Sequence, residues 1–187
     1  MDLAASVEKW PFKPDLDDRD DIYLLDLDST IGIKLGSGKN IEVKRFVSDH
    51  GVRELRSSTI GRLERWVKWS FELNPQPKTQ PDLSLPGSWV TVTKSRKTKK
   101  FAVDESGRAS VVDPATRPPR GVNFELTQLT INGAKWWTVG FEAFGDANRL
   151  PDVVNAVLAL PDATAQLPRL ALEESLSYPA WFPLVAR

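Results

Sequence analysis

Six charged residues stand in short segments of this sequence where polar and apolar side chains alternate. They are Lys34, Lys44, Lys94, Arg96, Glu125 and Glu142. Side chains two residues apart along a strand share one face of a sheet, so charges at this spacing can gather on a common surface. Concentrated lysine and arginine bind phosphates and other polyanions, and neighbouring carboxylates can hold a divalent cation. The six residues are therefore candidates for an ion-binding site.

The two glutamates belong to the clearest local signal, a β-hairpin over 122–144. Asn132-Gly133 favours a two-residue turn, which fixes the register so that Asn123 lies opposite Glu142. Glu125 and Glu142 then become diagonal neighbours on one face, about 7–8 Å apart at the backbone, and both carboxylates could reach one ion. The other face is predicted to belong to the core. It carries Val122, Phe124, Leu126, Trp137, Val139, Phe141 and Ala143.

A second hairpin is expected from segments 30–35 and 40–46, with Leu35 paired to Ile41. One of its faces is apolar and carries Ile31, Ile33, Leu35, Ile41 and Val43. Its other face is polar and carries Gly32, Lys34, Glu42 and Lys44. In the strand expected over 89–96, apolar residues give way to basic ones along one face, in the order Val90, Val92, Lys94 and Arg96.

Two interpretations of these polar faces remain open from the residues alone. Antiparallel sheets commonly bury one face and expose the other to water, and an exposed face would hold lysine and glutamate without any function. Alternatively, the polar faces line the interior of a curled or closed sheet, where the cations would bind an anion and the carboxylates a metal ion.

The remaining elements follow from spacing and turn residues. A helix is expected over 53–73, because apolar residues recur there at spacings of three and four. Four prolines predict a loop over 74–87, and the single histidine, His50, is also expected in a loop. Strands followed by helices indicate an antiparallel α+β fold.

A single domain is expected over 1–187, with a polar segment over 1–20 and a helical tail over 146–187 packed on the sheet. The tail ends in an aromatic pair, Trp181-Phe182, which could dock on the sheet or on another subunit.

Composition limits the classes of protein. The chain has 187 residues, 41% of them hydrophobic and 27% charged, as in ordinary globular domains. Its 25 basic and 25 acidic residues cancel, which argues against nucleic acid or an anionic membrane surface as the main partner. With no cysteine and one histidine, disulfides, thiolate chemistry and Cys/His zinc sites are excluded. No secretory signal or membrane-length apolar run is visible, so a cytoplasmic location is expected.

Several short motifs follow one another in a recognisable order. The first are Arg19-Asp20-Asp21-Ile22-Tyr23-Leu24, Ile31-Gly32-Ile33-Lys34-Leu35 and Ile41-Glu42-Val43-Lys44. The later ones are Val92-Thr93-Lys94-Ser95-Arg96, Phe124-Glu125-Leu126 and Phe141-Glu142-Ala143. This order resembles that of the CYTH superfamily, the triphosphate tunnel metalloenzymes. In that family a D-x-Y strand precedes an L-x-[IV]-[RK] strand, a strand ending in lysine, a K-x-R strand and later acidic strands.

The resemblance implies an antiparallel β-barrel or tunnel of about eight strands with helices packed outside. It implies phosphate contacts for Lys34, Lys44, Lys94 and Arg96, and Mg²⁺ or Mn²⁺ as a cofactor held by Glu125 and Glu142. The family's N-terminal Glu-x-Glu-x-Lys strand, which helps to bind the metal, is absent here. In its place the chain has Glu8-Lys9-Trp10 followed by aspartates, so it would be a divergent member.

Two functions are expected on this basis. One is binding, with metal-dependent hydrolysis, of a triphosphate or organic phosphate, in which cations neutralise the phosphates while the metal stabilises the leaving oxygen and helps to orient water. The other is a non-catalytic anion-binding or protein-interaction module on the same fold. The expected partner is a phosphorylated or other anionic small molecule, and the oligomeric state is left open.

Overall fold

The structure is a computed structural model that describes residues 18–25, 27–36, 39–56, 59–73, 89–164, 167 and 169–186. Its strands are β1 (Arg19–Leu24), β2 (Ile31–Gly36), β3 (Asn40–Arg56), β4 (Thr59–Glu72), β5 (Trp89–Val103), β6 (Ala109–Val112), β7 (Gly121–Ile131) and β8 (Ala134–Phe144). Its helices are α2 (Leu150–Leu158), α3 (Pro161–Thr164), the 3₁₀ helix η1 (Leu172–Glu174) and α4 (Tyr178–Val185). The predicted loop over 74–87 and residues 1–17 of the predicted polar segment lie outside the described residues.

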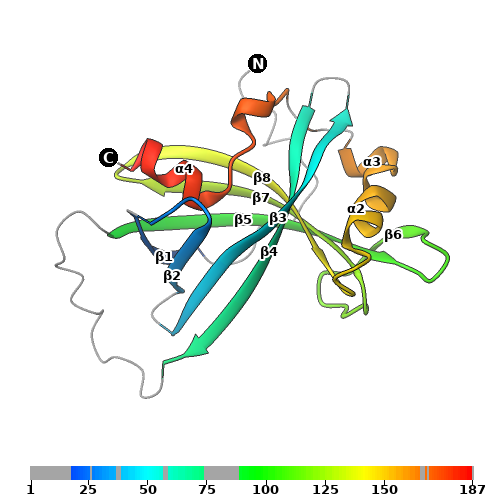
Figure 1. Cartoon of the computed structure of the whole chain (residues 1–187), viewed down its shortest axis with the longest axis horizontal. Helices are drawn as coiled ribbons and strands as arrows, with labels where there is room; N and C mark the ends of the chain where they lie inside the picture. Colours follow the sequence, from blue (N-terminus) through cyan, green and yellow to red (C-terminus); the bar gives the residue numbers. More distant parts are fainter. Residues whose placement is uncertain are drawn as a thin grey trace.

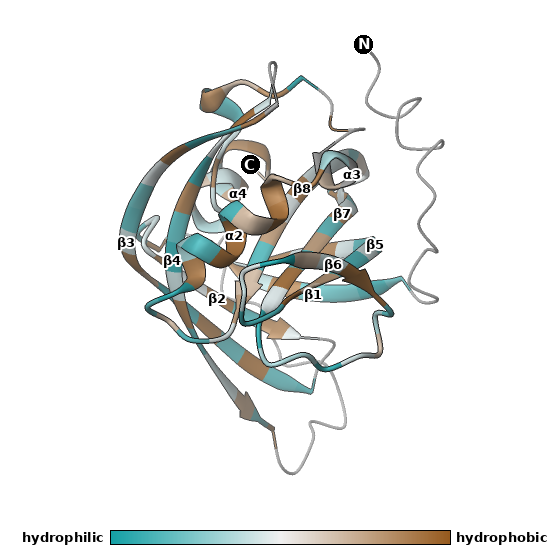
Figure 2. Cartoon of the chain, turned by 90° about the vertical axis from the view of Figure 1, so that its right-hand side faces the viewer, coloured by the Kyte–Doolittle hydropathy of each residue, from teal (hydrophilic) through white to brown (hydrophobic). Residues whose placement is uncertain are grey.

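The strands form one antiparallel sheet in the order β4-β3-β2-β1-β5-β7-β8, with β6 paired to β5 (Figure 1). The sheet curves strongly, so that β3 and β4 lie across from β5 and β7 (Figure 2). Its two end strands, β4 and β8, are not hydrogen-bonded to each other within the described ranges. The antiparallel strand-rich fold with helices is therefore as predicted, in the form of an open sheet.

Both predicted hairpin registers are confirmed. In the β7–β8 hairpin, Asn123 lies opposite Glu142, and the turn residues Asn132 and Gly133 have φ of 49° and 80°. Positive φ at both central positions is what a type I′ turn requires, and this turn type matches the right-handed twist of the strands. In the β2–β3 hairpin, Leu35 pairs with Ile41 as expected.

The sheet is buried on both faces, at different ends. On one face, Phe124 and Leu126 of β7 pack against α2, which contributes Val153, Val154 and Val157. This is the predicted core face. On the opposite face of β7, Leu129 and Ile131 are also fully buried. They belong to a second cluster that includes residues of α4. The face that carries Glu125 therefore ends in apolar packing against α4.

The prediction of a helix over 53–73 is wrong, because this segment contains the end of β3 and the whole of β4. From 67 to 72 apolar and polar side chains alternate, and cross-strand pairing with β3 covers this whole stretch. The register of β3 and β4 shifts at three irregularities between 46 and 56. Each irregularity inserts its extra residue in β3. In β4 itself, apolar residues stand on both faces, with Trp66 on one face and Leu63 and Val67 on the other, and this mixture mimics helical spacing. His50 lies within β3 rather than in a loop, as an exposed residue.

The C-terminal segment covers parts of both faces. Residues 170–176, expected to be helical, contain only η1, and Leu170 instead bridges to Thr59 at the start of β4. Phe182 of α4 is buried and its ring centroid lies 4.5 Å from that of Tyr23. The aromatic pair thus docks on the sheet of its own chain. Among the described residues, none of the helices has the length and apolarity needed to cross a bilayer.

Candidate anion-binding pocket

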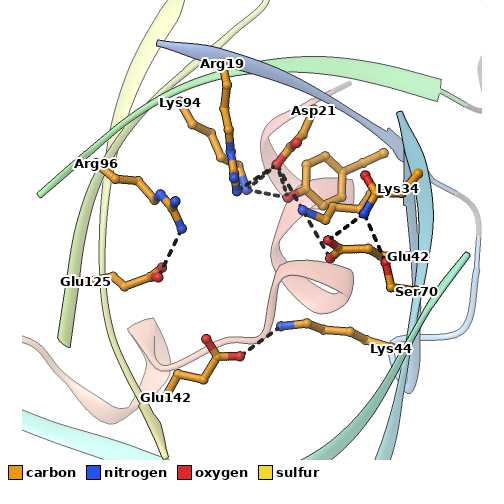
Figure 3. Close-up of polar contacts among 12 residues, drawn as sticks. Arg19, Asp21, Lys34, Glu42, Lys44, Ser70, Lys94, Arg96, Glu125 and Glu142 are labelled. Carbon is orange, nitrogen blue, oxygen red and sulfur yellow. Dashed lines mark hydrogen bonds and ion pairs between the residues drawn. The ribbon is translucent and has the colours of Figure 1, made fainter. Parts of the chain in front are cut away.

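A pocket of about 250 Å³ lies on the inner side of the curved sheet. All six predicted site residues line it. Its charged lining consists of six cations, Arg19, Lys34, Lys44, Lys68, Lys94 and Arg96, and three carboxylates, Glu42, Glu125 and Glu142. Figure 3 shows these side chains, with the exception of Lys68, pointing from the surrounding strands toward a common space, with α4 behind them. The lining therefore carries an excess of positive charge although the whole chain is neutral.

Five adjacent strands supply the cations: β1, β2, β3, β4 and β5. Two pairs of like charge lie directly opposite each other across strand pairs. Arg19 on β1 faces Lys94 on β5, and Lys44 on β3 faces Lys68 on β4. Directly opposed like charges destabilise a sheet, so this arrangement is costly unless negative charge lies close to it.

The inner end of the pocket is organised around one buried carboxylate, Asp21, whose side chain is 1% exposed. Its Oδ2 lies 3.2 Å from Lys34 Nζ, 3.5 Å from Lys94 Nζ and 3.5 Å from Arg19 Nη2. Burial alone would raise the pKa of Asp21, but the three cations outweigh it and hold this pKa below its ordinary value. We call Arg19, Asp21, Tyr23, Lys34 and Lys94 the inner cluster.

Lys94 is the most enclosed of the pocket cations, with a side chain that is 5% exposed. Its Nζ donates a hydrogen bond to the Tyr23 hydroxyl and lies 4.7 Å and 4.6 Å from the ring centroids of Tyr23 and Tyr178. The aromatic faces and Asp21 favour the ammonium form. Loss of water and the nearby Lys34 and Arg19 cations outweigh the attraction of Asp21 and lower the pKa of Lys94 to about 7.

The outer end of the pocket is more open to solvent. There Lys44 Nζ lies 3.7 Å from Glu142 Oε1, and Arg96 Nη1 lies 3.1 Å from Glu125 Oε1. The Lys44 and Glu142 side chains are 45% and 56% exposed. The Lys44–Glu142 pair joins β3 to β8, two strands that are far apart in the sheet order. We call these four residues the rim.

Helix α4 forms an apolar wall beside the inner cluster. Tyr178, Pro179, Phe182 and Pro183 of α4 all line the pocket. The helix approaches β2 closely at Gly32, where an added Cβ would lie only 2.9 Å from Pro179 Cγ. A glycine at this position is therefore what allows α4 to sit against β2 and to close this side of the pocket.

No protein-family model matches the chain, and no curated protein or solved structure is significantly similar to it. The chemistry of the pocket is therefore inferred from its own residues.

The two predicted metal ligands, Glu125 and Glu142, share the pocket, but each is paired with a different cation. Across the part of the chain that the structure describes, there is no group of three or more His, Cys, Asp or Glu side chains that could hold a metal ion. Two carboxylates are nevertheless a usual protein contribution to Mg²⁺, because substrate phosphates and water supply the other ligands.

The sequence analysis missed several pocket residues. Arg19, Asp21 and Tyr23 alternate along one strand and so share a face, and this spacing was a usable signal. Lys68 lies in the segment predicted to be a helix, although the alternation of Lys68, Ser70 and Glu72 with apolar neighbours from 67 onward is typical of a strand. Tyr178 comes from α4, and no local pattern indicates that its ring packs near Lys94.

Proposed function

We propose that this chain binds a phosphorylated or similarly multivalent anion in the pocket. The observation that carries the proposal is the pairing of like charges across the sheet, Arg19 opposite Lys94 and Lys44 opposite Lys68. Asp21 and Glu142 offset part of the repulsion within these pairs, and an anion bound between the cations would offset the rest.

The proposed ligand has to carry more than one negative charge. The pocket's own carboxylates and Asp21 compensate part of the basic lining, yet six cations remain against four acidic groups. Lysine and arginine side chains from several strands of one pocket suit a chain of phosphates, because each phosphate can accept charge-assisted hydrogen bonds from different strands.

The CYTH resemblance is consistent with this proposal. The motifs that carry it contribute Lys34, Lys44, Lys94 and Arg96, and all four line the pocket. We propose that the curved sheet is a tunnel-like variant of that fold. Support comes from the Lys44–Glu142 ion pair, which brings β3 within side-chain reach of β8.

Metal-dependent hydrolysis is a second candidate for the same pocket, because Glu125 and Glu142 both line it beside the cations. In this proposal these two carboxylates hold Mg²⁺ or Mn²⁺, and the ion would stabilise charge on the oxygen that leaves during phosphoryl transfer to water. Lys34, Lys94 and Arg96 would neutralise and orient the phosphates. The carboxylates would have to give up their present ion pairs with Arg96 and Lys44.

Calorimetry with tripolyphosphate in metal-free buffer tests the binding proposal. Wild-type protein should bind, and Lys34→Gln should bind at least about tenfold more weakly, since a charge-assisted hydrogen bond is lost. The matched control is Lys135→Gln, which removes an exposed lysine of β8 outside the pocket and should leave affinity unchanged. Equal affinity of all three proteins, or no binding, would refute the proposal.

Release of inorganic phosphate from tripolyphosphate separates hydrolysis from binding. Turnover that requires Mg²⁺ or Mn²⁺ and is lost in Glu142→Gln would support hydrolysis. Tight binding without turnover, and a ligand-induced rise in melting temperature, would support a non-catalytic module.

A further inference from the structure

Lys94 has an environment that anion binding alone does not require. Unlike the rim cations it is almost fully enclosed, yet it lines the pocket and so can meet a ligand. Its Nζ is held in place by the Tyr23 hydroxyl and the Asp21 carboxylate. An anion-binding lysine works best as a hydrated, fully charged ammonium on a mobile stem, whereas desolvated lysines beside other cations are the ones that act as nucleophiles.

We propose that Lys94 forms an imine with a phosphorylated aldehyde or ketone bound in the pocket. This inference rests on the proposed function, since the other five cations of the pocket would hold the phosphate, and it narrows the ligand class to carbonyl compounds. The nearby cations would position the carbonyl carbon against Nζ while the phosphate lies among the basic side chains.

The groups around Nζ come from three elements. They are Arg19, Asp21 and Tyr23 of β1, Lys34 of β2 and Tyr178 of α4. On the remaining side β7 places an apolar residue, Leu129, opposite Lys94. Loss of water at Lys94, reinforced by the Lys34 and Arg19 cations, lowers its pKa to about 7, which supplies a neutral amine near neutral pH.

Imine formation needs no reagent other than Lys94 and the carbonyl compound, and it releases one molecule of water. The lone pair of Nζ attacks the carbonyl carbon, a C–N bond forms, and the electrons of the C=O π bond move to oxygen. Tyr23 relays a proton from nitrogen to this oxygen, since its hydroxyl is already hydrogen-bonded to Nζ. The resulting carbinolamine loses its hydroxyl and the second amine proton as water, leaving the imine. The enclosed site slows the reverse attack by water.

Pyridoxal 5′-phosphate is a suitable probe, because it carries both an aldehyde and a phosphate. The full chain would be incubated with the probe at pH 7 and reduced with borohydride, and the labelled lysine located by peptide mass spectrometry. Lys94 should carry the label, and tripolyphosphate should prevent labelling. Pyridoxal, which lacks the phosphate, should label Lys94 at least about tenfold less, because the charge-assisted contacts are lost.

Two variants and a pH series sharpen the test. Lys94→Arg keeps a cation but cannot form an imine, so its label should disappear, whereas Lys135→Arg changes an exposed lysine and should leave labelling intact. Labelling of wild-type Lys94 should be half-maximal near pH 7. Protection of Lys94 by tripolyphosphate in the wild type gives an independent result if Lys94→Arg does not fold.

Four outcomes would overturn the inference. The first is label spread over exposed lysines, with Lys135 labelled as readily as Lys94. The second is labelling of Lys94 that tripolyphosphate does not reduce. The third is no adduct while calorimetry still detects tripolyphosphate, which refutes the imine and leaves the anion-binding proposal standing. Loss of both the adduct and the calorimetric signal would refute both.

Discussion

The inner cluster and the rim use the same residue types in opposite surroundings. Asp21 is 1% exposed and one of its oxygens meets three cations, whereas Glu142 is 56% exposed and lies 3.7 Å from Lys44. Water screens the rim charges, so their pairing contributes little. Inside the cluster Asp21 and Lys94 are almost fully enclosed, so each of these two charges depends on its charged neighbours rather than on water. The contribution of a charged residue of this pocket to the free energy of unfolding should therefore depend on how enclosed the residue is, rather than on how many charges lie nearby.

The largest effect is expected from Asp21→Asn, a nearly isosteric change that removes the carboxylate shared by three cations. Breaking a buried ion pair on one side usually lowers the free energy of unfolding by about 3–5 kcal/mol. Urea denaturation measures this directly. Glu142→Gln is the matched change at the rim, and a loss of similar size in both variants would abolish the distinction between the two ends.

Lys94 should make stability depend on pH. Its pKa falls from 10.5 in the unfolded chain to about 7 in the folded protein, so between these pH values the unfolded chain binds a proton that the folded chain does not. The free energy of unfolding should therefore rise with pH, by about 2 kcal/mol between pH 7 and 9, relative to a variant that lacks the amine. Denaturation of wild type and Lys94→Met at each pH isolates this difference. Parallel curves would show that Lys94 is not desolvated.

Replacing a cation of the inner cluster should weaken anion binding more than replacing a cation of the rim. Lys34 is 15% exposed and Lys44 45% exposed, so a phosphate contact to Lys34 is less screened by water. Lys34→Gln should weaken tripolyphosphate binding by about 10- to 100-fold, and Lys44→Gln by about two- to fivefold. Calorimetry at a fixed salt concentration measures both. The reverse order would mean that the ligand lies at the rim.

The smallest effect is expected from the Lys44–Glu142 pair itself. Glu142→Gln should change the free energy of unfolding by no more than about 1 kcal/mol. That difference should vanish at an ionic strength of about 1 M, where charges are screened within about 3 Å. A difference that persists in high salt would indicate that this pair is desolvated.

The hairpins could be predicted from the sequence because their information is local. Asn132-Gly133 determines the turn, the turn determines the register, and the register places Glu142 opposite Asn123. The long β3–β4 pair could not be predicted in this way. Its bulges shift the alternation, and several of its apolar side chains, such as Trp69 and Phe71, remain exposed, so burial does not impose a clear pattern.

The candidate site was predicted in part for a similar reason. Alternation placed Lys34 and Glu125 on polar faces and Lys94 where an apolar face becomes basic, but local sequence left open whether those faces meet water or each other. That depends on how the whole sheet curves. The role of Asp21 was also not apparent, because it depends on β2 and β5 lying on either side of β1.

The strand order also bears on how the protein folds. Tyr23 and Lys94, which are hydrogen-bonded in the inner cluster, are 71 positions apart in the chain, so the pocket cannot exist before β1 has joined β5. Contacts between distant segments form slowly, because the entropy of closing the intervening chain is lost first. A newly synthesised chain must therefore bring mutually repelling cations together late in folding. Polyphosphate present during refolding should speed this final step, in addition to occupying the finished pocket.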